Sequence, residues 1–519
     1  MKKEIKITLS PAQASDISKI KIAVSENLGI EITRIKDIVV RHRSIDSRNA
    51  NIRINLGIDV FVDEPIPIIE KPTFSYSDVS KRPSVIIIGA GPAGLFSALR
   101  LIELGFKPVI FERGKTVSER KRDIAAIHKE QIINPDSNYG FGEGGAGTFS
   151  DGKLYTRSKK RGDVRKILEV LNFHGAQSEI LIEAHPHIGT NILPRVIIAI
   201  RNSILGAGGE IHFNSLVTDL FIRDHETKGV VLRDGSIVEG LAVILATGHS
   251  SRDVYRMLHK NGLILESKPF AVGVRVEHPQ ELIDQMQYHG MKRGAYLPAA
   301  TYSFVEQVNN RGVYSFCMCP GGMIVPAATS PGELVLNGMS PSERGGRFAN
   351  SGMVVEIRPD DLPSYKMYPE VFAGLRFQED IEKLCFKMAG NSQFAPAQRL
   401  NDFVKGRRSV ILTESSYRPG LIESPLHEWL PTFVATRLRE AFKIIGNKSK
   451  GYITNEALVL GVESRTSSPV RIPRNMQTLE HVQIKRLFPC GEGSGYAGGI
   501  MSSAIDGERV ADAISTLYK

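Results

Sequence analysis

The residues with the clearest chemical meaning are three glycines and one carboxylate. Gly89, Gly91 and Gly94 have the spacing GxGxxG, and Glu112 follows 18 residues after Gly94. In this pattern the first glycine allows a tight turn, the second lets a pyrophosphate approach the backbone, and the third lets a helix pack close to a strand. The carboxylate can accept hydrogen bonds from both hydroxyls of a ribose. The pattern predicts a dinucleotide site without separating FAD from NAD, and Glu112 would repel a 2′-phosphate.

The flanking sequence supplies the elements that such a site needs. Residues 85–88 are a short apolar run, typical of a strand buried on both faces of a parallel sheet. A helix is expected from Pro92 to Leu104, ended by Gly105, and a strand over 108–111 places Glu112 at its end. Because strand, turn, helix and acid occur in order, a glycine turn that binds nothing is the weaker interpretation.

A second glycine-rich segment covers residues 139–153. Backbone N–H groups in such a loop can come close to a flat or anionic ligand. Phe141, Phe149 and Leu154 would anchor the loop, which favours a ligand loop over a mobile surface loop. Residues 242–248 indicate a further buried strand that ends at Gly248 and approaches the same dinucleotide.

The C-terminal part of the chain offers a second carboxylate and a second helix start. A strand that ends at Cys490 is followed by Glu492, and a helix is expected from Ile500. Glu492 could hold ribitol hydroxyls, and the helix N-terminus, with about half a positive charge, could face the N1/O2 edge of a flavin. This combination favours FAD over a simple loop. The candidate cofactor residues are Gly89, Gly91, Pro92, Ala93, Gly94, Glu112, Arg113, Gly144, Gly145, Thr148, Gly248, Gly491, Glu492, Gly498, Gly499 and Ile500.

The order of these patterns predicts an α/β fold. We expect a Rossmann-like FAD-binding domain (three-layer ββα) formed by residues 83–269 and 451–519, with an inserted α+β substrate domain at 270–450 that lacks a second dinucleotide pattern. Residues 1–75 predict a small βαββ module whose helix starts with a capping box at Ser10–Gln13. No residue cluster in this module suggests chemistry, so a role in packing or at an interface is favoured. Residues 64–82, rich in proline, are expected to be a linker.

Composition narrows the functional class. The 519 residues are 42% hydrophobic and 24% charged, which is ordinary for a globular protein. The net charge of +10 comes from scattered basic residues, which favours small anionic ligands over nucleic acid. Four cysteines do not make a disulfide framework, and no segment resembles a signal peptide or a membrane span. We therefore expect a cytoplasmic protein without membrane contact, and we predict no particular oligomeric state.

Three arginines and a cysteine are the candidate catalytic residues. A flavin supplies its own hydride chemistry, so the protein mainly orients the substrate. Arg465, Arg471 and Arg275 could bind a carboxylate or phosphate, and a surface ion pair is the alternative for each. Cys490 would lie beside the flavin.

The other cysteines and two histidines have less specific interpretations. Cys317 and Cys319 are expected to face one side of a strand. A redox role is possible for these two thiols and for Cys490, but a small buried apolar residue is the favoured interpretation. His187 and His278 could act as acid or base, although packed histidines are more common. No ligand spacing indicates a metal site.

Seven segments together resemble the bacterial FAD-dependent dehydrogenases that have a glutathione-reductase-type FAD domain and no separate NAD(P)H domain. The resemblance covers nearly the full length and implies FAD and an oxidoreductase fold, but little about the substrate. Glu492 stands where much of the superfamily has Asp, and its longer side chain should still reach the ribitol. The segments are GAGPAG at 89–94, FGEGGAGTFSDGKL at 141–154, ATGHSSRD at 246–253, FAVGVRVEHP at 270–279, FCMCPGG at 316–322, ESRTSSPVRI at 463–472 and PCGEGSGYAGGIMSSAIDG at 489–507.

These observations predict an FAD-dependent oxidoreductase. It would move a hydride or electron pair between the flavin and a small substrate, which is anionic if the candidate arginines bind it, with NAD(P)H as a transient co-substrate. Two alternatives stay open at this point. One is a flavoprotein that modifies RNA and grips it with the basic surface and the N-terminal module, and the other is a non-enzymatic module that senses a nucleotide.

Overall fold

The first 62 residues form a small antiparallel sheet with one helix. The computed structural model describes residues 1–66, 72–156, 162–365, 367 and 369–518. The module contains β1 (Lys2–Leu9), α1 (Ile17–Leu28), β2 (Ile35–Asp46) and β3 (Arg53–Val62), with β3 in the centre of the sheet. This is the predicted βαββ order. Part of the predicted linker, residues 67–71, lies outside the described residues.

The predicted start of the first helix was wrong. Ser10 and Gln13 do exchange hydrogen bonds, from Ser10 N–H to Gln13 Oε1 at 3.1 Å and from Gln13 N–H to Ser10 Oγ at 3.4 Å. These bonds close an isolated turn, and α1 begins only at Ile17. Asp16 caps it by accepting a hydrogen bond from Ser18 N–H at 2.9 Å, because a second capping residue stands directly before the apolar positions that face the sheet.

A five-stranded parallel sheet forms the centre of the cofactor domain. Its order is β21 (Leu487–Pro489), β10 (Val243–Leu245), β4 (Ser84–Ile88), β5 (Lys107–Phe111) and β6 (Glu210–His212). The edge strand β21 comes from the C-terminal end of the chain, so residues some four hundred positions apart share one sheet.

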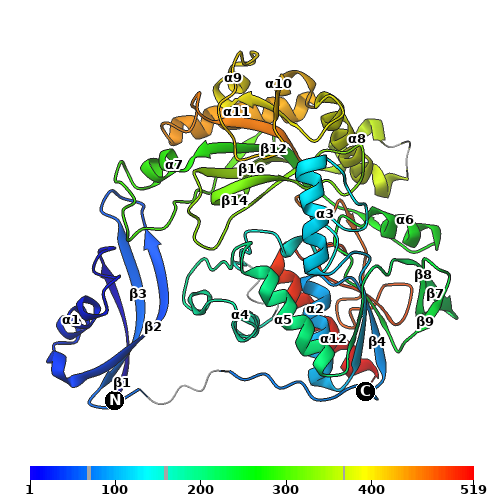
Figure 1. Cartoon of the computed structure of the whole chain (residues 1–519), viewed down its shortest axis with the longest axis horizontal. Helices are drawn as coiled ribbons and strands as arrows, with labels where there is room; N and C mark the ends of the chain where they lie inside the picture. The colour runs from blue at the N-terminus through cyan, green and yellow to red at the C-terminus, as the bar shows by residue number, and fades with distance from the viewer. Residues whose placement is uncertain (67–71, 157–161, 366, 368, 519) are drawn as a thin grey trace.

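Both faces of this sheet are covered, as the predicted three-layer ββα fold requires. Helices α2 (Pro92–Leu104), α5 (Leu193–Gly206) and α12 (Ile500–Tyr518) lie side by side on one face (Figure 1). A small antiparallel sheet of β7 (Val217–Arg223), β8 (Glu226–Leu232) and β9 (Ile237–Glu239) covers the other face. Helices α3 (Val117–Glu130), α4 (Val164–Phe173) and α6 (Arg252–Lys260) and the strand pair β11 (Glu266–Ser267) and β20 (Val470–Arg471) complete the domain.

The second domain is built on an eight-stranded mixed sheet. The path is β13-β14-β16-β12-β19-β17-β18, with β15 paired to β14. Its strands are β12 (Phe270–Pro279), β13 (Val305–Val308), β14 (Arg311–Pro326), β15 (Leu336–Met339), β16 (Phe348–Ile357), β17 (Ala395–Arg399), β18 (Leu421–Glu423) and β19 (Leu458–Glu463). Its helices are α7 (Gln280–Gln287), α8 (Ala373–Met388), α9 (Leu400–Lys405), α10 (Leu426–Trp429) and α11 (Thr432–Lys448).

The boundary between these domains differs from the one that we expected. Strand β19 pairs with β12 and β17, so residues 458–463 belong to the second sheet and not to the cofactor domain. The chain rejoins the parallel sheet only at β21. A buried apolar strand has the same local pattern in either sheet, so its partners could not be read from the pattern alone.

The N-terminal module contacts the cofactor domain through the edge of β2. Arg43 N–H donates to Ile182 O and Ala184 N–H donates to Arg43 O, both at 2.9 Å. His289 of the second domain lies 2.8 Å from Ser47 O through its Nε2. In the arrangement of Figure 1 the module therefore reaches both larger domains through one strand and the turn that follows it.

Candidate active site

Two carboxylates lie at the same edge of the parallel sheet. Glu112 follows β5 and Glu492 follows β21, and only β4 and β10 separate these two strands. Because all four strands are parallel, their carboxyl ends meet at this edge. In open α/β sheets, ligands bind outside the carboxyl ends of the strands.

The three glycines of the GxGxxG pattern have different structural roles. Gly89 has a φ of 105°, and a Cβ there would lie 2.6 Å from Ala246 O. A Cβ at Gly94 would lie 2.0 Å from Gly89 O, so this position is closed by helix–strand packing. A Cβ at Gly91 would meet nothing closer than 4.0 Å, the distance to Gly145 Cα. Gly91 is the N-cap of α2, so the open space lies at a helix N-terminus, where an anionic phosphate is stabilised.

Glu112 is already held by three backbone N–H groups. Ala90 N–H donates to Oε2 at 2.9 Å, and Gly114 and Gly142 donate to Oε1 at 2.9 and 3.0 Å. A carboxylate offers about four acceptor positions, so about one is left for a ribose hydroxyl. The sequence predicted that Glu112 accepts hydrogen bonds from both ribose hydroxyls. Both bonds would have to share this one remaining acceptor position. The carboxylate also connects the first glycine turn to the second glycine loop.

The second glycine loop lies on the N-termini of α2 and α12. A Cβ at Gly145 would lie 3.2 Å from Gly91 Cα, and a Cβ at Gly147 would lie 3.3 Å from Ile500 Cγ1 and 3.5 Å from Pro92 Cγ. Gly144 N–H donates to Ala90 O at 2.8 Å. The loop therefore lies at the sheet edge that carries Glu112 and Glu492, which we call the cofactor edge.

Arg120 stabilises this loop through hydrogen bonds to its backbone. This role was not predicted from the sequence. It is completely buried, and its guanidinium donates to the carbonyl oxygens of Asn138, Tyr139 and Glu143 at 2.7, 2.8 and 2.8 Å. Burial lowers the pKa of Arg120 to about 10. A lone arginine on a basic helix has no sequence signal that separates it from its exposed neighbours.

Two of the predicted cofactor residues have their polar groups engaged within the protein. Thr148 is buried and its hydroxyl donates to Glu143 O at 2.7 Å. Arg113 donates to Asp136 and Asp253 at 3.1 and 3.0 Å and lies 4.4 Å above the Phe141 ring. Both side chains therefore shape the loop and are not directed at open space.

The tail supplies the other half of the edge. Gly491 N–H donates to Asp506 Oδ2 at 2.8 Å, and a Cβ at Gly491 would lie 2.8 Å from Ala93 Cβ. Glu492 is one quarter exposed, and one of its oxygens lies 3.4 Å from His249 Nδ1. A Cβ would meet nothing within 4 Å at three further predicted positions, Gly248, Gly498 and Gly499.

This edge fits FAD. It combines two helix N-termini, two carboxylates and four glycine positions that adjoin open space. Gly91 and Pro92 would hold the pyrophosphate, Glu112 a ribose and Glu492 the ribitol. The start of α12 at Gly499–Ile500 would face the flavin ring.

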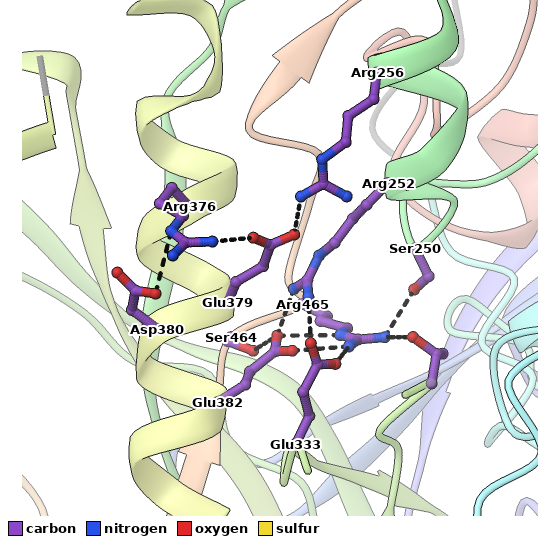
Figure 2. Close-up of polar contacts among 11 residues, drawn as sticks. Ser250, Arg252, Arg256, Glu333, Arg376, Glu379, Asp380, Glu382, Ser464 and Arg465 are labelled. Atoms are coloured by element: carbon purple, nitrogen blue, oxygen red, sulfur yellow. Dashed lines mark hydrogen bonds and ion pairs between the residues drawn. The ribbon is translucent and has the colours of Figure 1, made fainter. Parts of the chain in front are cut away.

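Arg465 is not available for a substrate, contrary to the sequence prediction. It donates from Nε and Nη2 to Glu382 at 3.1 and 2.8 Å, from Nη2 to Glu333 at 3.0 Å, and from Nη1 to Thr329 Oγ1 at 2.6 Å (Figure 2). Arg252 on α6 donates to the same two carboxylates. Arg465 is therefore part of a buried ionic cluster that joins the two large domains.

Arg275 is also engaged within the protein. It is completely buried and donates to Glu463 at 2.8 Å, to Asn350 Oδ1 at 3.0 Å and to Cys317 O at 2.8 Å. The prediction that Arg275 binds a substrate is not supported, because its Nε, Nη1 and Nη2 all have partners within the protein. Cys490 is completely buried, and burial together with the Asp506 charge holds its pKa well above the usual range. A protonated thiol in this position is suited to packing and not to redox catalysis.

Arg471 differs from the other two arginines. Its side chain is 42% exposed, and its nearest carboxylate, Glu266, is 3.6 Å away. It borders the tail loop, since a Cβ at Gly495 would lie 3.3 Å from Arg471 Cβ. Lys268 lies close enough that burial and then the Arg471 charge lower its pKa, while Glu492 partly offsets this effect. Two cations therefore adjoin the part of the edge that holds Glu492.

The two histidines that we considered both lie against backbone carbonyl oxygens. His278 is completely buried, its Nε2 lies 2.9 Å from Tyr452 O, and burial lowers its pKa to about 4. His187 has its Nε2 at 3.0 Å from Ser342 O, and burial lowers its pKa as well.

Of the helices in the described part of the chain, none is both long enough and apolar enough to cross a bilayer.

Comparisons with known proteins agree with an FAD site. A family model described as "FAD-dependent protein, C-terminal domain-like" matches residues 269–466, and one described as a domain of unknown function matches residues 1–61. An "Uncharacterized protein" of Clostridium beijerinckii is 39% identical over 520 residues, which are 96% of each chain. Mitochondrial dihydrolipoyl dehydrogenase of Rattus norvegicus is 30% identical over 73 residues, which are 14% of each chain.

Solved structures are more distant. The crystal structure of CtdE in complex with FAD is 12% identical, with 84% of this chain and 85% of that chain covered and a TM-score of 0.34. The flavin-dependent brominase Bmp2 is 12% identical, with coverages of 84% and 79% and a TM-score of 0.35.

Proposed function

This chain belongs to the same family as its Clostridium beijerinckii relative, and its residues 269–466 match the model described as "FAD-dependent protein, C-terminal domain-like"; from that premise we propose that it is an FAD-dependent oxidoreductase. It moves a hydride or an electron pair between bound FAD and a small anionic substrate. FAD supplies the hydride chemistry when it is bound, and the protein binds, orients and shields the reactants.

The observation that carries the proposal is the meeting of Glu112, Glu492 and two helix N-termini at one sheet edge. The N-terminus of α2 stabilises a pyrophosphate beside Gly91. The N-terminus of α12, which has no acidic residue in its first turn, would stabilise negative charge at the reduced flavin ring. Stabilisation of the reduced flavin is useful to an enzyme that transfers electrons to a substrate. A protein that only senses a nucleotide does not need it.

The anionic substrate is supported by Arg471 and Lys268. Arg471 is partly exposed, with Glu266 at 3.6 Å and the Tyr496 ring at 5.7 Å, and the Arg471 charge acts on Lys268. Two neighbouring cations repel each other, so a carboxylate or phosphate between them would stabilise both. The proposal includes NADH or NADPH as a transient reductant, since only one GxGxxG pattern with the required context is present and FAD occupies it.

An anaerobic screen tests the proposal. The FAD-loaded protein is mixed with NADH, NADPH and a panel of small carboxylates and phosphates, and loss of the oxidised flavin absorbance is followed. At least one compound should bleach the flavin rapidly. If the protein holds FAD and none bleaches it, the oxidoreductase proposal fails.

A pair of variants tests the role of Arg471. In Arg471→Met the concentration of the bleaching anion needed for half-maximal rate should rise by at least tenfold, which is about 1.4 kcal/mol of binding. Arg486→Met is the matched control, because Arg486 stands before β21, at the opposite end of that strand. Equal behaviour of the two variants would remove Arg471 from the substrate site.

A further inference from the structure

Cys317 and Cys319 lie together in a charged environment, which we call the thiol cluster and define as Cys317, Cys319, Lys153 and Arg275. Lys153 Nζ is 3.9 Å from the Cys317 sulfur and 3.8 Å from the Cys319 sulfur. Arg275 Nη2 is 3.5 Å from the Cys319 sulfur. Cys319 is buried and Cys317 is partly exposed. Two thiols that share two cations differ from the buried apolar residues that the sequence favoured.

The backbone at the two cysteines departs from an ordinary extended strand. In an extended strand, residues two apart are about 6.6 Å apart, near the upper limit of about 6.8 Å for the Cα atoms of a disulfide. Cys317 has a φ of 47°, a left-handed conformation that is rare for cysteine. The pairing of β14 with β16 shifts between Phe316 and Cys319. At this bulge the Cys319 thiol lies against its neighbour, donating to Cys317 O at 3.2 Å.

The charges favour a thiolate at Cys317 over one at Cys319. The hydrogen bond from Cys319, followed by the charges of Lys153 and Arg275, holds the pKa of Cys317 well below its usual range. The same hydrogen bond, followed by burial, holds the pKa of Cys319 well above it. Asp151, which pairs with Lys153 at 3.0 Å, opposes the first effect. Thiol–disulfide chemistry needs such an ionised sulfur beside a protonated one.

The thiol cluster is connected to the cofactor edge by one loop. Gly147 contacts Pro92 and Ile500 at the two helix N-termini, and Lys153 follows on the same loop. Arg344 of the second domain donates to Asp151 of this loop at 3.0 Å. The two cysteines therefore lie on the second domain where it meets the loop that borders the cofactor edge.

We propose that Cys317 and Cys319 are a redox pair that closes to a disulfide and exchanges two electrons with bound FAD. The inference rests on the FAD-dependent redox function proposed above. In the oxidative direction one S–S bond forms, the S–H bond of Cys319 breaks, and two electrons and that proton pass to the flavin. In the reverse direction the reduced flavin returns them and the bond is cleaved. Lys153, with its Nζ 3.9 Å from the Cys317 sulfur, is a positioning residue that favours the ionised form of this sulfur.

Counting electrons tests the pair. The air-oxidised, FAD-loaded protein is titrated anaerobically with dithionite. The wild type should take up about four electrons per FAD, because the disulfide adds a two-electron couple to that of the flavin. Cys317→Ser and Cys319→Ser should take up about two, and Cys385→Ala, which changes a buried cysteine outside the thiol cluster, should behave as the wild type. An uptake of about two electrons by the wild type would overturn the proposal.

Thiol counting gives a readout that does not depend on the flavin signal. After denaturation of the oxidised protein without reductant, two of the four cysteines should resist alkylation, and peptide mass analysis should find residues 317 and 319 linked. In the reduced, folded protein, Lys153→Met should slow alkylation of Cys317 at neutral pH and shift its rate profile to higher pH, whereas Lys153→Arg should restore it. Four free thiols in the oxidised protein, or an unchanged pH profile in Lys153→Met, would count against the pair.

The outcomes separate this inference from the proposed function. A wild type that is bleached by a substrate but shows neither a disulfide nor extra electrons would keep the oxidoreductase and remove the redox pair. A disulfide with about four electrons per FAD would support the pair even if no substrate in the screen bleaches the flavin.

Discussion

Arg465 donates to both carboxylate oxygens of Glu382, from Nε at 3.1 Å and from Nη2 at 2.8 Å. Arg465 follows β19 and Glu382 lies on α8, while Arg252 from the cofactor domain donates to Glu382 at 2.8 Å (Figure 2). All three side chains are at least nine-tenths buried. The two large domains are thus joined by buried ion pairs. If one partner is removed, the charge of the other stays buried without water to solvate it.

The first prediction concerns this cluster. Arg465→Met should lower the free energy of unfolding by about 3–5 kcal/mol, because it leaves Glu382 and Glu333 with one buried cation fewer. Arg471→Met, at an exposed position, should change it by less than about 0.5 kcal/mol. Urea unfolding of both variants checks this. Similar stabilities would contradict the interdomain role of Arg465.

The second prediction concerns pH. Burial, followed by repulsion from Glu382, raises the pKa of Glu333 to about 7 from an ordinary value of 4.5. Between pH 4.5 and about 7, Glu333 is therefore protonated in the folded protein and ionised in the unfolded chain. The contribution of Glu333 to the free energy of unfolding is present at low pH and is lost as the pH rises through this range.

Glu333→Gln removes this titration. The stability of the wild type relative to this variant should fall by up to about 1.4 kcal/mol per pH unit between pH 5 and 7, and then level off. Glu463, whose pKa burial also raises to about 7, is present in both proteins, so its effect cancels. Thermal unfolding in matched buffers measures the difference. Parallel curves would refute the assignment.

The third prediction separates the glycines of the first turn. Gly94→Ala should destabilise the protein by about 1–3 kcal/mol, because the new methyl group would lie 2.0 Å from Gly89 O. Gly91→Ala should cost no more than about 1 kcal/mol, the scale of an N-cap change, but it should weaken FAD binding at least tenfold. FAD content and thermal unfolding of the FAD-free protein are the measurements. Wild-type FAD affinity in Gly91→Ala would place the pyrophosphate elsewhere.

The fourth prediction compares the two carboxylates. Glu112→Gln should destabilise the FAD-free protein by about 1–3 kcal/mol, because an amide NH₂ would face backbone N–H donors. Glu492→Gln should leave the FAD-free protein nearly unchanged, since its nearest partner is His249 at 3.4 Å. Both variants should bind FAD more weakly, as measured by titration. A stable Glu112→Gln protein would mean that the three N–H bonds contribute little.

Local patterns were sufficient for the elements around the cofactor edge. Helix α2 has the predicted bounds, Pro92 to Leu104, and Gly105 ends it with a φ of 85°. The glycine spacing, the apolar strand and the acid all act within about 30 residues, so their geometry follows from backbone conformation and packing of near neighbours. The start of α1 was missed because Ser10 and Asp16 are both good caps, and only the docked helix shows which one is used.

The partners of the charged and thiol groups were decided by the tertiary structure. Arg465 and Arg275 have the residue type of anion-binding side chains, but the fold places each against a buried glutamate. Cys317 meets Lys153 across 164 positions of sequence. The sequence by itself determined the strand–turn–helix unit and its carboxylate, because these depend on local spacing. Which charges meet depends on how distant strands are paired, and only the completed sheets determine that pairing.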